Sequence, residues 1–335
     1  MRAWQYETID NGIENSLKLS TSAPVPTPKP NQHLVRIIAT ALNPVDYKPA
    51  EVPLMRRVAI PNQATPGIDF VGRIAKPASG SPLKVDQLVC GMAGASALAG
   101  AALAEYDVAD IKAVIAVPEG VDPVDAGSIG VTGLTAYQSI MPHIKSGSRL
   151  FLNGGSGGTG IWGIQIAKAA GCNVTVSCST ANVELCRSLG ADQVLDYKKS
   201  PILEQLKQEK PFDHVVDNVG GDYDLYWRCH EYTTPSAKFI GIAASPNLSF
   251  FAFAAKVRLM PGFLGGGKRK YAGLFAEPKT DQLEWIAKLV AEKKARAIID
   301  ERFAFEKAPE AFRKLKTGRA RGKILVDVSG ELGNL

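Results

Sequence analysis

Hydrophobic positions follow one pattern up to about Val117 and a different pattern after it. In the first part, short apolar stretches are separated by prolines, glycines and other turn residues, a pattern typical of short β-strands. The stretches that predict strands there are Ala3–Tyr6, His33–Ala41, Asp69–Ala75, Gln87–Gly91 and Tyr106–Ala109. We therefore expect a β-rich first domain over residues 1–120.

After Pro118 and Gly120, apolar segments of strand length alternate with segments of helical periodicity. This alternation predicts a doubly wound α/β domain with a parallel sheet over residues 121–277. Its expected strands are Arg149–Asn153, Asn173–Ser177, Gln193–Asp196, His214–Asn218 and Lys238–Ile242.

The C-terminal part is expected to complete the first domain with residues 278–335. The glycine-rich stretch Pro261–Ala276 predicts a mobile loop, and the apolar positions of Asp281–Glu292 share one side of a predicted helix. A helix at Ala308–Lys316 and a strand at Lys323–Val328 then return most simply to the β-rich domain.

Gly155, Gly157 and Gly160 stand between a predicted strand and a predicted helix and match the pattern G-x-G-x-x-G. In that pattern the glycines permit a tight turn, close approach of the backbone to a pyrophosphate, and close packing of helix on strand. The anion then lies at the helix N-terminus, where the amide groups favour it. The pattern alone is a weak signal, but the flanking strand and helix favour a dinucleotide site over a merely flexible loop.

The end of the second predicted strand favours NADPH over NADH. An NAD site usually places an acid about 20 residues beyond the first glycines, where it binds the ribose hydroxyls. Here Ser177, Cys178, Ser179 and Thr180 take that place, followed by Asn182. Neutral donors and a helix N-terminus suit a phosphate, and the missing acid favours this interpretation over the alternative that Ser179 or Thr180 is only an N-cap. Arg187 either assists the phosphate or is a solvated surface residue.

Composition narrows the class of protein. A chain of 335 residues suits two domains, and the net charge of +6 is mild and dispersed. The basic runs Lys268–Lys270 and Arg313–Lys323 lack a nucleic-acid-binding motif, so we interpret them as solvated faces or cofactor contacts. Five cysteines without a C-x-x-C pair, no signal peptide and no membrane span predict a cytosolic protein without disulfides.

Several separate motifs follow one another in a fixed order along the chain. They are ALNPVDYK at Ala41–Lys48, PGIDFVG at Pro66–Gly72, GVTGLTAYQ at Gly130–Gln138, the glycine motif, SLGADQVLDY at Ser188–Tyr197, DNVGG at Asp217–Gly221, FLGGGKRKY at Phe263–Tyr271 and GRARGKILV at Gly318–Val326. On these motifs the whole chain resembles the zinc-independent quinone oxidoreductase and enoyl reductase branch of the medium-chain dehydrogenase/reductase superfamily. The resemblance implies a GroES-like first domain, a Rossmann second domain and a cofactor cleft between them. It leaves open whether the protein is a monomer or a homodimer.

No zinc site is expected. Zinc alcohol dehydrogenases have a cysteine where this chain has Asn43, and a His-Glu pair where it has Ile68 and Asp69. Tetrahedral zinc needs three protein ligands, and the four histidines have no metal spacing. Without a Lewis acid, reduction of a conjugated double bond or a quinone is favoured over alcohol oxidation.

Such a reduction develops negative charge on an oxygen and then needs a proton. Tyr47 and Lys48 are the candidate catalytic residues, because the matching segment of related fungal enoyl reductases lines the cofactor cleft. The alternative is that Tyr47 packs, Lys48 is solvated and water supplies the proton. Asp46 is expected to cap the turn or to position Lys48.

The resemblance also implies the cofactor-binding residues, from the nicotinamide to the adenosine phosphate. They are Asp46, Lys48, Thr132, Gly155, Ser156, Gly157, Gly158, Thr159, Ser179, Thr180, Asn182, Tyr197, Asn218, Val219, Ile242 and Lys323.

The sequence allows several interpretations of the substrate site and of the function. Leu248–Phe253, with Phe263 and Leu264, predicts either a lipophilic substrate pocket, a core helix or a dimer contact. We expect an NADPH-dependent reductase of hydrophobic enones, enoyl groups or quinones. The alternatives are a non-catalytic NADPH-binding redox sensor or partner-binding protein, and an enoyl reductase acting on a carrier-bound acyl chain docked at Lys268–Lys270.

Overall fold

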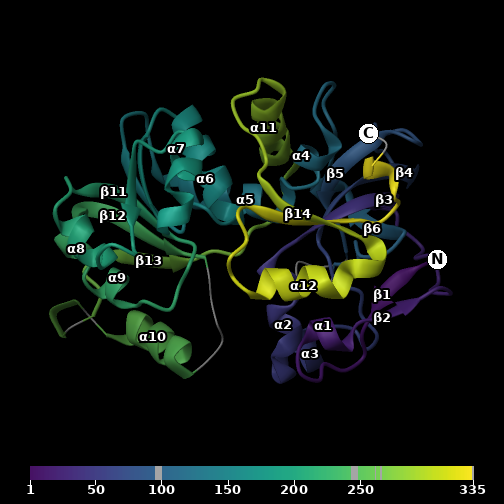
Figure 1. Cartoon of the computed structure of the whole chain (residues 1–335), viewed down its shortest axis with the longest axis horizontal. Helices are drawn as coiled ribbons and strands as arrows, with labels where there is room; N and C mark the ends of the chain where they lie inside the picture. The colour runs from purple at the N-terminus through teal and green to yellow at the C-terminus, as the bar shows by residue number, and fades with distance from the viewer. Residues whose placement is uncertain (95–99, 243–247, 261, 265, 334–335) are drawn as a thin grey trace. The chain divides into compact units, whose positions relative to one another are not determined.

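The computed structural model describes residues 1–94, 100–242, 248–260, 262–264 and 266–333 and divides into two compact units (Figure 1). The β-rich unit comprises Met1–Leu134 with Glu277–Leu335, and the parallel-sheet unit comprises Thr135–Ala276. The sequence pattern places the first boundary near residue 120, whereas the units divide inside helix α5 (Gly130–Ile140). The predicted combination of a β-rich domain and a Rossmann-type domain is confirmed.

In the β-rich unit, the main sheet joins strands from both ends of the chain. Its order is β14 (Ile299–Ala304), β15 (Lys323–Asp327), β3 (Gln32–Leu42), β4 (Asp69–Lys76), β5 (Leu88–Met92) and β7 (Val114–Ala116), with β6 (Tyr106–Asp110) also paired to β3. A second small sheet pairs β1 (Ala3–Gln5) with β2 (Lys18–Ser20). Strand β15 runs antiparallel to β3, with Ile324 opposite Leu42, so the C-terminal strand does return to the first domain.

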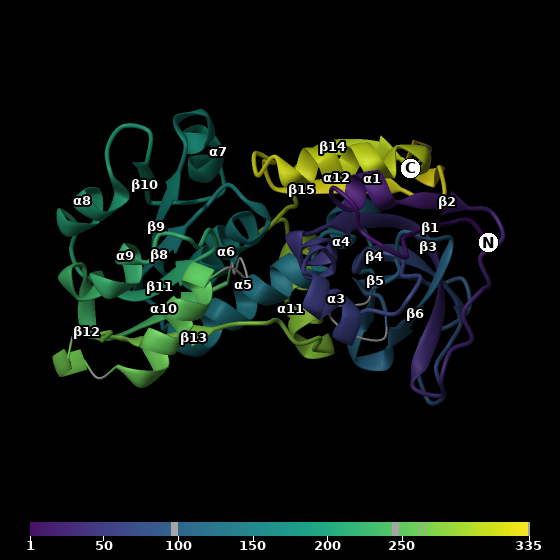
Figure 2. The same ribbon diagram turned by 90° about the horizontal axis from the view of Figure 1, so that it is seen from below.

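Helix α12 (Ala308–Lys316) covers part of this sheet because its apolar residues recur at helical spacing. Ala308, Ala311 and Phe312 are buried in the core cluster that also contains Ile324. In Figures 1 and 2 the helix lies beside α1 (Ile13–Ser16). An ion pair joins the two helices, with Lys316 Nζ 2.7 Å from Glu14 Oε2. The other α-helices of the unit are α2 (Lys48–Glu51), α3 (Pro53–Ala59), α4 (Pro123–Ala126) and α11 (Thr280–Ala291).

In the parallel-sheet unit, every strand pair is parallel and the order is β10-β9-β8-β11-β12-β13. The strands are β10 (Gln193–Asp196), β9 (Asn173–Cys178), β8 (Arg149–Asn153), β11 (Phe212–Asp217), β12 (Thr233–Gly241) and β13 (Lys270–Gly273). The helices are α6 (Gly158–Ala169), α7 (Val183–Ser188), α8 (Ile202–Lys207), α9 (Asp224–Trp227) and α10 (Leu248–Leu259). The sequence order reverses between β8 and β11, and ligands of such sheets bind beyond the carboxyl ends of the strands at this point.

The prediction of a loop over residues 261–276 is wrong for part of that stretch. Strand β13 lies within it and pairs with β12, with Tyr271 opposite Phe239. Tyr271 packs on the rings of Phe239 and Phe253, with centroid distances of 6.0 and 5.2 Å. These contacts are non-local, so the apolar pattern of a short, glycine-flanked segment does not indicate the strand. Gly265 lies outside the described residues.

Candidate functional site

The glycine turn after β8 is tight and leaves little room for side chains at two of its motif positions. Gly154 has a φ of +84°, a conformation that side chains disfavour. A Cβ on Gly160 would lie 2.2 Å from the carbonyl oxygen of Gly154, and a Cβ on Gly155 would lie 2.8 Å from Val176 Cβ. Gly157 differs, because its φ is −81° and the nearest atom to its Cβ position is 3.8 Å away. The fold therefore requires Gly155 and Gly160, while the space beside Gly157 is open.

A chain of hydrogen bonds from neutral donors holds this turn to three strand ends. Ser177 Oγ, on β9, donates to Asn153 Oδ1 at 2.5 Å and accepts from the Gly154 N–H at 2.9 Å. Asn153 Nδ2, on β8, donates to Asp217 Oδ1 at 2.8 Å. The same Asp217 oxygen, at the end of β11, accepts from the N–H groups of Val219 and Gly220 at 3.0 and 3.1 Å. Sequence reasoning missed Asn153 and Asp217 as supports, although both are polar residues that end apolar strands.

Several predicted cofactor residues lie together at the ends of β8 and β9. Asn182 Nδ2 donates to Ser156 Oγ at 3.0 Å, which joins the predicted phosphate segment to the glycine turn. Thr180 Oγ1 donates to Asp196 Oδ2 at 2.7 Å, so its proton is already engaged. Tyr197 follows β10 and is 49% exposed.

Two of the predicted cofactor residues carry buried oxygens without a partner. Among the described residues, Asn182 Oδ1 and Asn218 Oδ1 accept no hydrogen bond. Buried polar atoms are nearly always paired, so such atoms at the carboxyl edge of a Rossmann-type sheet suit a bound polar ligand. Ile242 donates its N–H to Asp217 O at 2.9 Å, which places it beside Asn218 at the ends of β11 and β12.

In the β-rich unit, the candidate catalytic residues follow the short turn Pro44–Asp46. Lys48 begins α2, and burial lowers the pKa of its ammonium. Burial also raises the pKa of the half-buried Tyr47, whose ring lies 5.7 Å from Lys316 Nζ. A lowered ammonium pKa eases proton release and a raised phenol pKa opposes it, so Lys48 is the better placed of the two to donate a proton.

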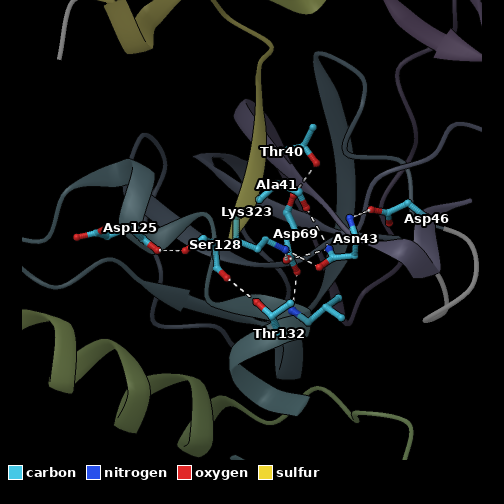
Figure 3. A network of polar contacts seen from close by, with 10 residues as sticks. Thr40, Ala41, Asn43, Asp46, Asp69, Asp125, Ser128, Thr132 and Lys323 are labelled. Carbon is cyan, nitrogen blue, oxygen red and sulfur yellow. Dashed lines mark hydrogen bonds and ion pairs between the residues drawn. The ribbon is translucent and has the colours of Figure 1, made fainter. Parts of the chain in front are cut away.

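Lys323 lies in a buried polar network next to this turn (Figure 3). Its side chain is 1% exposed, and its ammonium is bonded to Asp69 Oδ2 at 3.0 Å and to Asn43 Oδ1. The second Asp69 oxygen accepts from the N–H of Val131, in the first turn of α5, at 2.6 Å. Nearby, the Thr132 hydroxyl donates to Ser128 O at 3.1 Å. The predicted cofactor contacts of Lys323 and Thr132 stay predictions, and the structure gives Lys323 a second role as a buried cation.

Asp46 completes the turn as predicted for a capping residue. Its Oδ2 accepts from the Asn43 N–H at 2.6 Å. Burial, with a smaller contribution from the charge of Asp69, raises the pKa of Asp46 to about 7. Sequence reasoning missed the network of Asn43, Asp69 and Lys323, for which the signal is an acid inside the apolar segment at residues 66–72.

The described residues contain no group of three or more His, Cys, Asp or Glu side chains able to hold a metal ion. Asn43 and Asp69 instead share the ammonium of Lys323. Burial lowers the pKa of His214 to about 4, so this histidine is a neutral core residue.

The segment predicted as a substrate pocket, a core helix or a dimer contact is helical from Leu248 in α10. Phe253 is buried, Phe251 is 58% exposed, and Phe250 and Phe253 line a small cavity with Tyr223, Tyr226, Phe239 and Tyr271. The cavity volume of about 20 Å³ suits one or two water molecules rather than an organic substrate. Residues 244–247 and the side chains of Leu248 and Phe263 lie outside the described part.

Comparisons with known proteins assign the family. The model "Alcohol dehydrogenase GroES-like domain" matches residues 29–119, and "Zinc-binding dehydrogenase" matches residues 189–326. The chain is 44% identical to "Trans-enoyl reductase pgmF" of Aspergillus terreus, over 98% of this chain and 96% of that protein. The chain belongs to the medium-chain dehydrogenase/reductase family. Within this oxidoreductase family it is also 32% identical to "Chloroplast envelope quinone oxidoreductase homolog" of Arabidopsis thaliana, over 98% of both chains.

Solved structures of the medium-chain dehydrogenase/reductase family agree with this assignment. The quinone oxidoreductase from Coxiella burnetii superposes with a TM-score of 0.84 at 27% identity, over 98% of this chain and 99% of that chain. CurK enoyl reductase gives a TM-score of 0.78 at 19% identity, over 97% and 98%, which shows a common fold. No helix in the described residues is long and apolar enough to span a membrane.

Proposed function

We propose that this protein is an NADPH-dependent reductase of activated carbon–carbon double bonds or quinones that works without zinc. The observation that carries the proposal is the glycine turn. The space beside Gly157 is open, so the fold does not require a glycine at this position, whereas a pyrophosphate that approaches the backbone there would require one. Relatives named trans-enoyl reductase and quinone oxidoreductase support the reaction type.

The residues of the parallel-sheet unit fit a dinucleotide. The amides of Ser156, Gly158 and Thr159 belong to the turn and first turn of α6, a position that suits a pyrophosphate. The unpartnered oxygens of Asn182 and Asn218 suit ribose hydroxyls or the nicotinamide amide. Strand β9 ends at Cys178 without an acid, and Ser179 with Asn182 supplies neutral donors that favour the phosphate of NADPH.

In the β-rich unit, the residues handle the proton that the reaction needs. When bound, the reduced cofactor supplies the hydride to an electron-poor carbon. Lys48, whose ammonium pKa is lowered by burial, donates a proton to the reduced substrate, and Asp46 fixes the turn that precedes it. Zinc is not needed, because the acceptor is conjugated and the buried ammonium of Lys323 already neutralises Asp69.

The test follows absorbance loss of NADPH, and separately NADH, with a naphthoquinone, an alkyl vinyl ketone, a 2-alkenal, an enoyl thioester and a saturated aldehyde. We expect NADPH oxidation with the conjugated substrates or the quinone, none with the saturated aldehyde, and no effect of a zinc chelator. Lys48→Met should lower kcat by about 10²-fold if Lys48 supplies the proton. Turnover only with added zinc, or a preference for NADH, contradicts the proposal.

Tight NADPH binding without turnover of any acceptor would instead support the alternative of a non-catalytic sensor. The enoyl thioester is the first substrate to test, because the relative that shares 44% identity carries the name trans-enoyl reductase.

A further inference from the structure

We propose that Lys323 is a positioning residue, whose buried ammonium holds the turn before Lys48 and the first turn of α5 in their working arrangement. This inference rests on the proposed function for its effect on catalysis. Its structural part, the coupling of two chain segments through one cation, stands on contacts inside the β-rich unit.

The register of β15 brings the ammonium to the end of β3. Lys323 is the first residue of β15, and Ile324 lies opposite Leu42, the last residue of β3. Asn43 follows directly, and its Oδ1 accepts from Lys323 Nζ. The lysine therefore reaches from a strand near the C-terminus to the turn that carries the candidate proton donors.

Asp69 shares the same ammonium and extends the link to α5. Its Oδ2 accepts from Lys323 Nζ and from Asn43 Nδ2, both at 3.0 Å, while its Oδ1 accepts from the Val131 N–H. A Cβ on Gly130 would lie 2.2 Å from that same Oδ1. The glycine therefore lets the first turn of α5 approach the carboxylate more closely than a residue with a side chain could. The carboxylate also favours the positive end of the α5 dipole.

Asn43 also fixes the position of the residues that follow it. Its side chain donates to Ala41 O at 3.0 Å, and its backbone N–H donates to Asp46 Oδ2 at 2.6 Å. Tyr47 and Lys48 follow Asp46 without an intervening residue. One ammonium thus orients the start of α2 through Asn43 and the segment of Thr132 through Asp69.

Fold stability alone does not account for this arrangement. Apolar residues of similar volume replace many buried ion pairs without loss of stability, because desolvation of the charges offsets their attraction. An ammonium and a carboxylate add direction, since each bond to Asn43, Asp69 and Val131 fixes an atom of a different segment.

The test compares Lys323→Met with Lys314→Met, which removes the more exposed ion pair between α12 and Asp300 (3.0 Å) in the same unit. We expect Lys323→Met to lower kcat about tenfold or more. A Kd for NADPH that changes less than about threefold separates this positioning role from the predicted cofactor contact of Lys323, which would weaken NADPH binding. Amide exchange at Val131 and Tyr47 should accelerate about tenfold in this variant. Lys314→Met should change neither quantity. A folded Lys323→Met with wild-type kcat and exchange overturns the proposal.

A second variant decides the outcome if Lys323→Met does not fold. Lys323→Met/Asp69→Asn removes both buried charges, so folding should return while the ammonium bond to Asn43 stays absent. Low kcat in this folded double variant supports positioning, and recovery of kcat with folding overturns it. If the wild-type protein turns over none of the acceptors, the proposed function fails, and exchange at Val131 and Tyr47 alone decides whether Lys323 couples the two segments.

Discussion

Each of the two units joins its strand ends through one buried carboxylate, but the donors differ. In the β-rich unit, Asp69 is fully buried and its partners include the ammonium of Lys323. In the parallel-sheet unit, the partners of Asp217 are all neutral: the Asn153 amide and the N–H groups of Val219 and Gly220. The first carboxylate pairs with a cation as well as with two neutral donors, the Asn43 amide and the Val131 N–H, whereas the second is held by neutral donors alone.

This difference matches what each unit is proposed to do. The glycine turn has to receive an anion, and a scaffold of neutral dipoles shapes the backbone there through Ser177 and Asn153. The turn before Lys48 has to keep a fixed orientation beside α5, and an ion pair gives that orientation directly. Removal of one member of a buried ion pair leaves an unpaired buried charge, which costs much stability. Removal of one neutral donor from a hydrogen-bond network costs only the stability of its own bonds.

The same substitution in both carboxylates should separate the two cases most strongly. Asp69→Asn leaves the buried ammonium without a countercharge and should cost about 3–5 kcal/mol of unfolding free energy. Asp217→Asn keeps an Oδ1 that accepts from the same donors, so we expect a loss of about 1 kcal/mol. Urea denaturation with a brief thiol-labelling pulse measures the unfolding of each unit separately. Labelling of the buried Cys90 reports unfolding of the β-rich unit, and labelling of the buried Cys229 reports unfolding of the parallel-sheet unit. Equal losses would remove the distinction.

Within the parallel-sheet unit, Gly160→Ala and Gly157→Ala should differ in stability but not in cofactor binding. The new Cβ at residue 160 meets Gly154 O at 2.2 Å, so the turn has to shift at a cost of about 1–3 kcal/mol. At residue 157 the space is open, and we expect a cost of at most about 1 kcal/mol. Both variants should weaken NADPH binding in a fluorescence titration. Undiminished affinity in Gly157→Ala would show that no ligand approaches there.

The units should also respond to pH with opposite signs. Burial raises the pKa values of Asp46 and Asp107 to about 7, so their contribution to the β-rich unit is present at acidic pH and is lost as pH rises from about 4 to about 7. Burial lowers the pKa of His214 to about 4, so its contribution to the parallel-sheet unit is lost as pH falls from about 6.5 to about 4. Between pH of about 5 and 6, we expect changes of about 2–3 kcal/mol in the β-rich unit and about 1 kcal/mol in the parallel-sheet unit.

Two variants assign these pH effects to single groups. Asp46→Asn keeps an acceptor for the Asn43 N–H and should flatten part of the profile reported by Cys90. His214→Gln should flatten the acidic side of the profile reported by Cys229. Profiles of the same sign in both units would contradict the assignment.

Local patterns were enough to predict much of the fold. Strand β8 and helix α12 have the predicted bounds, Arg149–Asn153 and Ala308–Lys316, because apolar periodicity and flanking turn residues determine them. Strand β13 was missed because its identity depends on pairing with β12. The family motifs and the glycine pattern likewise predict where polar groups of the turn lie, but not which of them bond to each other.

The buried ion pair shows the physical limit of that approach. Lys323 ends a basic run in which Arg313, Arg319 and Arg321 are exposed, and the pairing of β15 with β3 takes it into the core. Its partner Asp69 is 254 positions away in the chain. A contact of this range depends on the sheet order, which hydrophobic spacing does not specify.

The smallest expected effect tests whether the neutral network depends on directed bonds or only on burial. Ser177→Ala removes the bonds to Asn153 and Gly154 and should cost about 1 kcal/mol, with a several-fold weaker affinity for NADPH. Thr175, two residues earlier on β9, is the matched control, because its buried hydroxyl has no partner among the described residues. Thr175→Val should therefore be neutral or slightly stabilising, with NADPH affinity unchanged. If both variants lose the same stability in urea denaturation, packing around β9 rather than the Ser177 bonds supports the glycine turn.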